Sequence, residues 1–330
     1  MLIAAAALLQ SAAGTPAHAS PITGPGHGGI GRGGIGIRLL EAPANRRLDP
    51  RARIYIVDHL PPGRTIRRRI EVSSTSSKPQ HVELYAAAAG ITHHRFILIP
   101  GRPQNELSTW TSLDHPALDL PPHGQATVRV TIKVPRTASP GEQYGVIWAQ
   151  NTAKPDASHN VGMVNAVGIR MYLDIGPGGE PPSDFQIDKL TPMRDAHGRP
   201  ELVIQVHNTG GRALDMSGSL SLSDGPLNAG PFAATSGVTL ARGDTAPVTV
   251  VLYGRVPNGP WKMRLTLQSG MVKKTLTSTV TFPASGIGKP VAMSVPLPTP
   301  LLLAGLAALT ALAAALTNHR RTHMKRTKNP

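Results

Sequence analysis

The sequence predicts an all-β protein with two tandem β-sandwich domains and one C-terminal transmembrane helix. Glycine and proline, at 34 and 32 of 330 residues, favour short strands joined by many turns over helical packing. Apolar and polar residues alternate in several segments, which is the period of a strand with one face on a core. Between the two ends of the chain, no apolar stripe of helical period runs longer than two turns.

The N-terminal segment has the features of an export signal followed by a flexible leader. An apolar run over residues 2–9 is too short to span a bilayer, and the Ala-His-Ala sequence at 17–19 fits a signal-peptide cleavage site. We therefore expect residues 1–19 to be a signal peptide. The glycine-rich residues 20–34 are expected to form a flexible leader at the mature N-terminus.

The middle of the chain repeats one order of strands and turns. Each half has an alternating strand, a polar turn, further strands, a Val-Pro pair and a glycine-containing turn. Short strands with regularly spaced turns predict immunoglobulin-like (Ig-like) sandwiches, here over residues 35–178 and 183–285. The sequence GPGGEPPS at 176–183 indicates a stiff linker between them.

One strand, over residues 126–134, shows the alternation most clearly and fixes an expected register. Its apolar residues occupy every second position, and a proline follows it directly. Since successive side chains of a strand point to opposite faces, one set is expected in the core and the other in water. The buried set should include Val128, Val130 and Ile132, and the exposed set Arg129 and Lys133.

The C-terminal end predicts a membrane anchor. Residues 286–300 form a proline-rich linker, and residues 301–317 carry no charge. At about 1.5 Å per residue this run gives a helix slightly shorter than a hydrocarbon core of about 30 Å, which suffices with flanking residues. Residues 318–330 contain five Lys and Arg and no acidic residue, so they should stay in the cytoplasm. The protein is expected in the cell membrane, with both sandwiches outside.

Catalytic and metal-binding signatures are missing from the sequence. The chain has no cysteine, which excludes disulfides and thiolate metal sites. It lacks the nucleophile elbow, the zinc-protease helix motif and the P-loop. The adjacent pair His93-His94 would point to opposite faces of a strand and could not chelate one ion. We expect no enzyme activity, no cofactor and no metal.

Positive charge is concentrated near the start of the first predicted domain. The chain carries a net charge of +15, and residues 32–69 hold ten arginines against three acidic residues. A basic surface outside a cell attracts anionic wall polymers and acidic glycans, whereas nucleic acid is not expected there. Alternatively, these arginines only solubilise a β-rich surface. The candidate contacts with an anionic polymer are Arg46, Arg47, Arg51, Arg53, Arg67 and Arg69.

Trp110, in the sequence Ser-Thr-Trp-Thr-Ser, has two interpretations. An exposed indole could stack on a sugar ring of a wall polymer. Alternatively, Trp110 fills the core of the first sandwich, which we favour because only 4% of the residues are aromatic and a sandwich needs large central side chains.

The strand and turn segments of the first domain follow one another in a characteristic order, at residues 53–57, 60–64, 71–78, 82–86, 108–112, 118–124, 134–135 and 140–145. In this order the stretch 35–175 resembles the peptidoglycan-binding domain of WxL-interacting proteins, a family of Gram-positive surface proteins. The resemblance covers somewhat less than half of the chain. It implies non-catalytic binding to the cell wall. The second domain does not match the host-binding domain of that family.

Two functions of different kinds follow. The first is a non-enzymatic cell-surface protein whose first sandwich binds peptidoglycan or an anionic wall polymer, with the second sandwich as a spacer or as a platform for another surface protein. The alternative is an Ig-like extracytoplasmic assembly factor or chaperone that handles other exported proteins through exposed strand edges. A wall binder should bind purified sacculi, whereas a chaperone should bind extended peptides.

Overall fold

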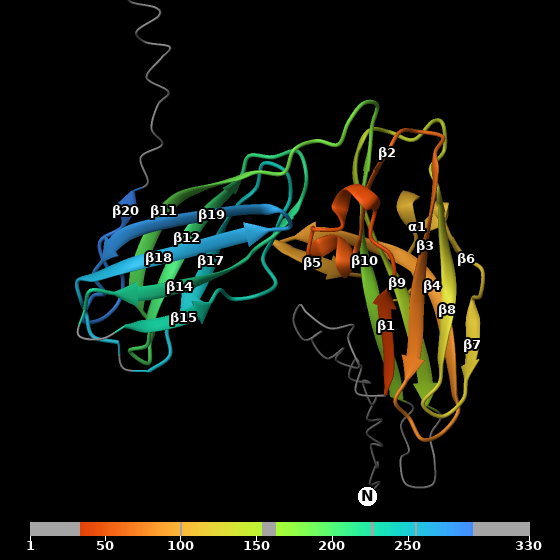
Figure 1. Ribbon diagram of the computed structural model, residues 1–330, viewed down its shortest axis with the longest axis horizontal. Coiled ribbons are helices and arrows are strands. Elements are labelled where there is room, and N and C mark those ends of the chain that lie inside the picture. The colour runs from red at the N-terminus through yellow and green to blue at the C-terminus, as the bar shows by residue number, and fades with distance from the viewer. Residues whose placement is uncertain (1–33, 100, 154–162, 226–227, 255, 293–330) are drawn as a thin grey trace, which may run out of the picture.

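The structure is a computed structural model that describes two β-sandwiches in tandem, as predicted (Figure 1). The described residues are 34–99, 101–153, 163–225, 228–254 and 256–292. The predicted signal peptide, transmembrane helix and basic tail lie outside them. Among the described residues, no helix is both long enough and apolar enough to cross a membrane.

Within the described residues, the first sandwich contains ten strands in two sheets. One sheet has the order β1-β3-β8-β6, formed by Ile35–Leu39, Thr65–Ser74, Gln125–Lys133 and Thr111–Leu113. The other has the order β2-β10-β9-β4-β5, formed by Ile56–Leu60, Met163–Ile175, Gly141–Ala153, Gln80–Thr92 and Arg95–Leu98, with β7 (Ala117–Leu120) paired to β4. Three short helices join the strands: η1 (Ala44–Arg46), η2 (Arg51–Arg53) and α1 (Glu106–Trp110).

The predicted register of β8 is confirmed. Val130 is fully buried between the two sheets, and its two apolar neighbours on the same face are at most 1% exposed. Arg129 and Lys133 are exposed on the other face of the sheet. The hydrophobic effect therefore fixes this strand, because a shift by one residue would place two charged side chains in the core.

The second sandwich contains the other ten strands. One sheet has the order β17-β12-β11-β20, formed by Thr245–Val251, Pro200–Asn208, Phe185–Arg194 and Val291–Ala292. The facing sheet has the order β15-β14-β18-β19, formed by Ala229–Ala233, Ser217–Ser223, Trp261–Ser269 and Val272–Val280. A short pair, β13 (Leu214–Asp215) and β16 (Thr239–Leu240), completes it.

Trp261 is the central side chain of the second core. It is fully buried, and its indole Nε1 donates a hydrogen bond to the carbonyl oxygen of Pro257 at 2.9 Å. The strand β20 pairs with β11 through Val291 and Ala292, so this sandwich extends beyond the predicted end at residue 285. A strand of only two residues has no periodicity from which it could be predicted.

Candidate functional site

Strand β10 of the first sandwich has an edge that is open along half of its length. On one side it pairs with β9 over all thirteen residues. On the other side it pairs with β2, in parallel, only over Met171–Ile175. Among the described residues, no strand pairs with this second side between positions 164 and 170. Within the described part of the chain, backbone donors and acceptors on that side have no strand partner and are available to another strand.

Except for Arg170 at its end, the open part of β10 lacks the features by which proteins usually protect an edge strand. Natural edges carry charges, prolines or bulges that discourage pairing with another chain. The sequence from Val164 to Ile169 contains no charge and no proline, and its pairing with β9 has no register shift. Val164 is 59% exposed, and Ala166 is also exposed. This stretch is thus an accessible template for strand addition.

A second open edge lies beside the first. Among the described strands, β1 forms the edge of its own sheet and pairs with β3 alone. It lies next to β10, so each sheet has a strand with one open edge on the same side of the sandwich (Figure 1). A partner that adds a strand to β10 would also lie against β1.

The other end of β10 enters the junction between the two sandwiches, where Arg212 is the central residue. Arg212 belongs to the second sandwich but is only 1% exposed. Its Nε donates a hydrogen bond to Oε1 of Glu142 on β9 at 2.8 Å, and its Nη1 pairs with Glu180 of the linker. Its Nη2 donates to the backbone carbonyls of Asp58 and Tyr172, each at 3.3 Å. One side chain therefore joins β2, β9, β10 and the linker.

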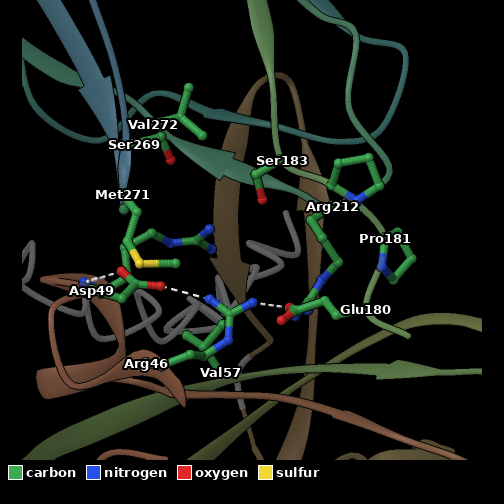
Figure 2. A pocket seen from close by; sticks show the side chains of 13 residues that line it. Arg46, Asp49, Val57, Glu180, Pro181, Ser183, Arg212, Ser269, Met271 and Val272 are labelled. Carbon is green, nitrogen blue, oxygen red and sulfur yellow. Dashed lines mark hydrogen bonds and ion pairs between the residues drawn. The ribbon is translucent and has the colours of Figure 1, made fainter. Parts of the chain in front are cut away.

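Two arginines that we expected on an exposed basic surface lie in this junction instead, so that expectation is wrong for Arg46 and Arg51. Each is 8% exposed. Arg46 Nη1 donates to Oδ2 of Asp49 at 2.6 Å, and Arg46 also pairs with Glu180 (Figure 2). The short helices η1 and η2 turn these two side chains toward the second sandwich.

Arg51 connects the first sandwich directly to the second. Its Nη1 donates to the carbonyl oxygen of Ala213 at 2.8 Å, and its Nε lies 2.8 Å from Oδ2 of Asp215. Its guanidinium carbon lies 4.5 Å from the ring centre of Tyr172, a cation–π distance. The Tyr172 hydroxyl in turn donates to Oδ1 of Asp215 at 2.9 Å.

The electrostatics of the junction follow from its burial and its paired charges. Burial lowers the pKa of Arg46, and the neighbouring Arg212 adds to this, against the attraction of Asp49. Burial also opposes the charge of Arg51, but the combined attraction of several neighbours, led by Asp215, outweighs it and holds the pKa of Arg51 above its ordinary value. Burial raises the pKa of the Tyr172 hydroxyl well above its usual range.

A cavity of about 260 Å³ lies within this network (Figure 2). Its wall includes the guanidinium groups of the junction and the turn from Ser269 to Val272. Since Arg46, Arg51 and Arg212 each have a carboxylate partner, the junction carries little surplus charge with which to bind an anion. Its ion pairs instead join the second sandwich to the first sandwich and to the linker.

A hairpin of the first sandwich makes one further contact with the second. The turn between β4 and β5 contains His93 and His94, both with positive φ. The carbonyl oxygen of His94 accepts a hydrogen bond from the backbone N–H of Thr239 at 2.8 Å. Among the described residues, no group of three or more His, Cys, Asp or Glu side chains could hold a metal ion.

The other candidate arginines lie at the surface. Arg47 and Arg53 are exposed near the junction, and the side chain of Arg53 donates to the carbonyl oxygen of Arg47. Arg67 and Arg69 are exposed and alternate along β3, so they share one outer face as expected. Arg69 pairs with Glu41, an ion pair that offsets part of its charge. Contact of these four residues with an anionic polymer stays a prediction.

Trp110 ends helix α1 and packs, partly buried, against the core of the first sandwich. The helix begins at a capping box, because the Asn105 side chain accepts from the Ser108 N–H and the Ser108 hydroxyl accepts from the Asn105 N–H. This placement agrees with core filling. Sugar stacking by Trp110 remains a prediction.

Comparisons with known proteins give weak matches to solved structures. No family model matches the chain, and no curated protein matches it. Among solved structures, the Pseudomonas aeruginosa CupB2 chaperone is 12% identical at a TM-score of 0.35, over 69% of this chain and 97% of that one. The E. coli chaperone DraB gives 12% and 0.36, over 68% and 95%, and the class 5 fimbriae chaperone CfaA gives 15% and 0.33, over 74% and 99%. Values this low provide no basis for assigning function.

Proposed function

We propose that the protein is an extracytoplasmic assembly factor that holds an extended segment of another exported protein as an added strand on the edge of β10. The observation that supports this most directly is the open edge over residues 164–170, which carries no charge from Val164 to Ile169. In strand addition, main-chain hydrogen bonds supply most of the affinity. No bond is made or broken, so the function needs no catalytic group.

The junction contributes by anchoring one end of β10. Residues Met171–Ile175 of β10 are held between β9 and β2, and Arg212 binds the carbonyl of Tyr172 within this stretch. The edge is therefore anchored at one end and open at the other. The membrane helix expected at residues 301–317 would keep this edge outside the cell, where exported proteins emerge.

Wall binding keeps one structural observation in its favour. Arg67 and Arg69 share an exposed face of the first sandwich, on the sheet opposite to β10. Planar guanidinium groups suit phosphate or carboxylate. However, the six candidate arginines do not form one surface, because Arg46 and Arg51 are buried in the junction.

The test combines hydrogen exchange with a charge placed at the edge. The full chain in detergent is mixed with an eleven-residue peptide of alternating valine and threonine, and amide exchange is followed along β10. We expect protection at residues 164–170. Replacing Ala166 with aspartate should weaken binding about tenfold, because a charge at an open edge opposes strand pairing. Thr266→Asp is the control, since its strand β18 is paired on both sides.

Sedimentation with purified sacculi tests the competing function, which is wall binding. If no extended peptide protects β10, the assembly function is wrong. Wall binding replaces it if the chain then sediments with sacculi and the double change Arg67→Gln and Arg69→Gln weakens this at low salt. Screening makes the same change less effective at high salt.

A further inference from the structure

The side chains beside the open edge of β10 indicate which extended segments it would accept. Tyr85, Trp148 and Gly168 are direct cross-strand partners and form one row across β4, β9 and β10. Side chains in such a row lie on the same face of the sheet. A strand added to β10 would place a fourth residue in this row, directly opposite Gly168.

Neighbouring side chains occupy the space over Gly168, so this position requires glycine. A Cβ atom at position 168 would lie 2.7 Å from Cγ2 of Val146 and 3.1 Å from Cε3 of Trp148. The indole ring of Trp148 therefore extends over the glycine toward the open edge. Trp148 is only half-buried, whereas Val146, two residues before it on the same face of β9, is fully buried. Part of an apolar ring beside Gly168 is thus exposed to solvent.

We propose that the bound segment carries a large apolar side chain opposite Gly168, which packs on the exposed part of Trp148. This inference rests on the proposed function and names the chemistry of the segment that is bound. Adjacent strands are about 4.8 Å apart, so Trp148 lies two strand spacings from the added residue. Because Gly168 has no side chain of its own, a leucine or phenylalanine can reach across it to the ring, whereas alanine or serine cannot.

The neighbouring rows do not offer the same contact. Toward the start of β10, Ala166 pairs with Gln150, whose amide oxygen accepts a hydrogen bond from the Tyr85 hydroxyl. Toward the junction, Arg170 carries a charge and interacts with Asp215. The row of Gly168 is thus the apolar one between two polar neighbours. A single apolar residue at this position would also fix the register of the bound strand.

The test uses the full chain in detergent and peptides of alternating serine and threonine that differ only in one central residue. This residue is phenylalanine, leucine, alanine or serine. Binding is measured by titration, and amide exchange of β10 is recorded for each peptide. We expect phenylalanine and leucine to bind at least about tenfold more tightly than alanine and serine, as is common when an interface tryptophan is engaged.

A pair of variants assigns the preference to Trp148. Trp148→Ala should bring the affinities of the four peptides to within about twofold, whereas Trp148→Phe should keep most of the difference. If all four peptides protect β10 with equal affinity on the parent chain, this inference is wrong and the assembly function stands. That result depends only on the parent chain, so it holds even if Trp148→Ala fails to fold. If no peptide protects β10, both proposals are wrong.

Discussion

Replacing Arg212 with alanine would show whether the ion pairs of the junction hold the two sandwiches in one orientation. The change removes the hydrogen bond to Glu142 and leaves this carboxylate, whose side chain is 7% exposed, without its cationic partner. Breaking one side of a buried ion pair costs about 3–5 kcal/mol. Glu142 still accepts from the Ala213 N–H at 2.6 Å and from the Tyr144 hydroxyl at 3.0 Å. The loss should therefore lie near the lower value, about 3 kcal/mol.

This loss should appear both in thermal unfolding and in the distance between the sandwiches. For a protein of this size, 3 kcal/mol lowers the melting temperature by roughly 6–12 °C. The absence of native cysteine allows one spin label to be placed on each sandwich without removing any residue. We expect a narrow distance distribution in the parent chain and a broad one in Arg212→Ala. Arg199→Ala is the control, because its ion pair with Asp195 is at the surface and contributes little.

The reasoning would be refuted by a variant that melts within about 2 °C of the parent and keeps a narrow distance distribution. Apolar packing between the sandwiches would then fix their orientation. The small cluster that includes Tyr172 and Ala213, both fully buried, would be the next candidate.

Two further predictions concern the first sandwich. Val130 is fully buried, so replacing it with aspartate places an unpaired charge in the core. Denaturant unfolding should show a loss of stability of about 4 kcal/mol or more. An unchanged midpoint would contradict the register of β8. Burial raises the pKa of Asp58 above its ordinary value of 3.8, against the attraction of Arg68. The folded state then holds the proton of the Asp58 carboxyl more tightly than the unfolded chain does. The stability of the parent should therefore fall relative to that of Asp58→Asn as pH rises from about 4 through the raised pKa. A rise in relative stability over this pH range would show that the pKa of Asp58 is not raised.

The strands could be predicted from the sequence because their signal is local. In β8 and β18 every second residue is apolar, and the structure buries these residues in both strands, Ala126 only partly. The end of β10 shows the limit of this method. Alternation predicts that Tyr172 and Asp174 face water, but they are 0% and 5% exposed. The second sandwich and β2 cover them, and neither contact is encoded in the period of the strand itself.

The junction could not be predicted because its contacts join residues far apart in the chain. Arg51 binds the backbone of Ala213, 162 positions away. A segment rich in arginine is expected in water unless acidic partners are known to surround it. Those partners, such as Glu142 and Glu180, come from another strand and from the linker. The only local indication of these acidic partners is the single acidic residue in the otherwise uncharged linker sequence at 176–183.

The open edge and the junction depend on each other through β10. An edge strand with free backbone groups on one side is prone to fray, since it makes only half of the hydrogen bonds of a central strand. In β10 the last five residues are paired on both sides, and the junction covers their outer face. This anchor lets the first half of β10 stay unpaired on its open side while it keeps its register with β9. A weakened junction should therefore reduce strand binding at residues 164–170 even though Arg212 lies outside that edge.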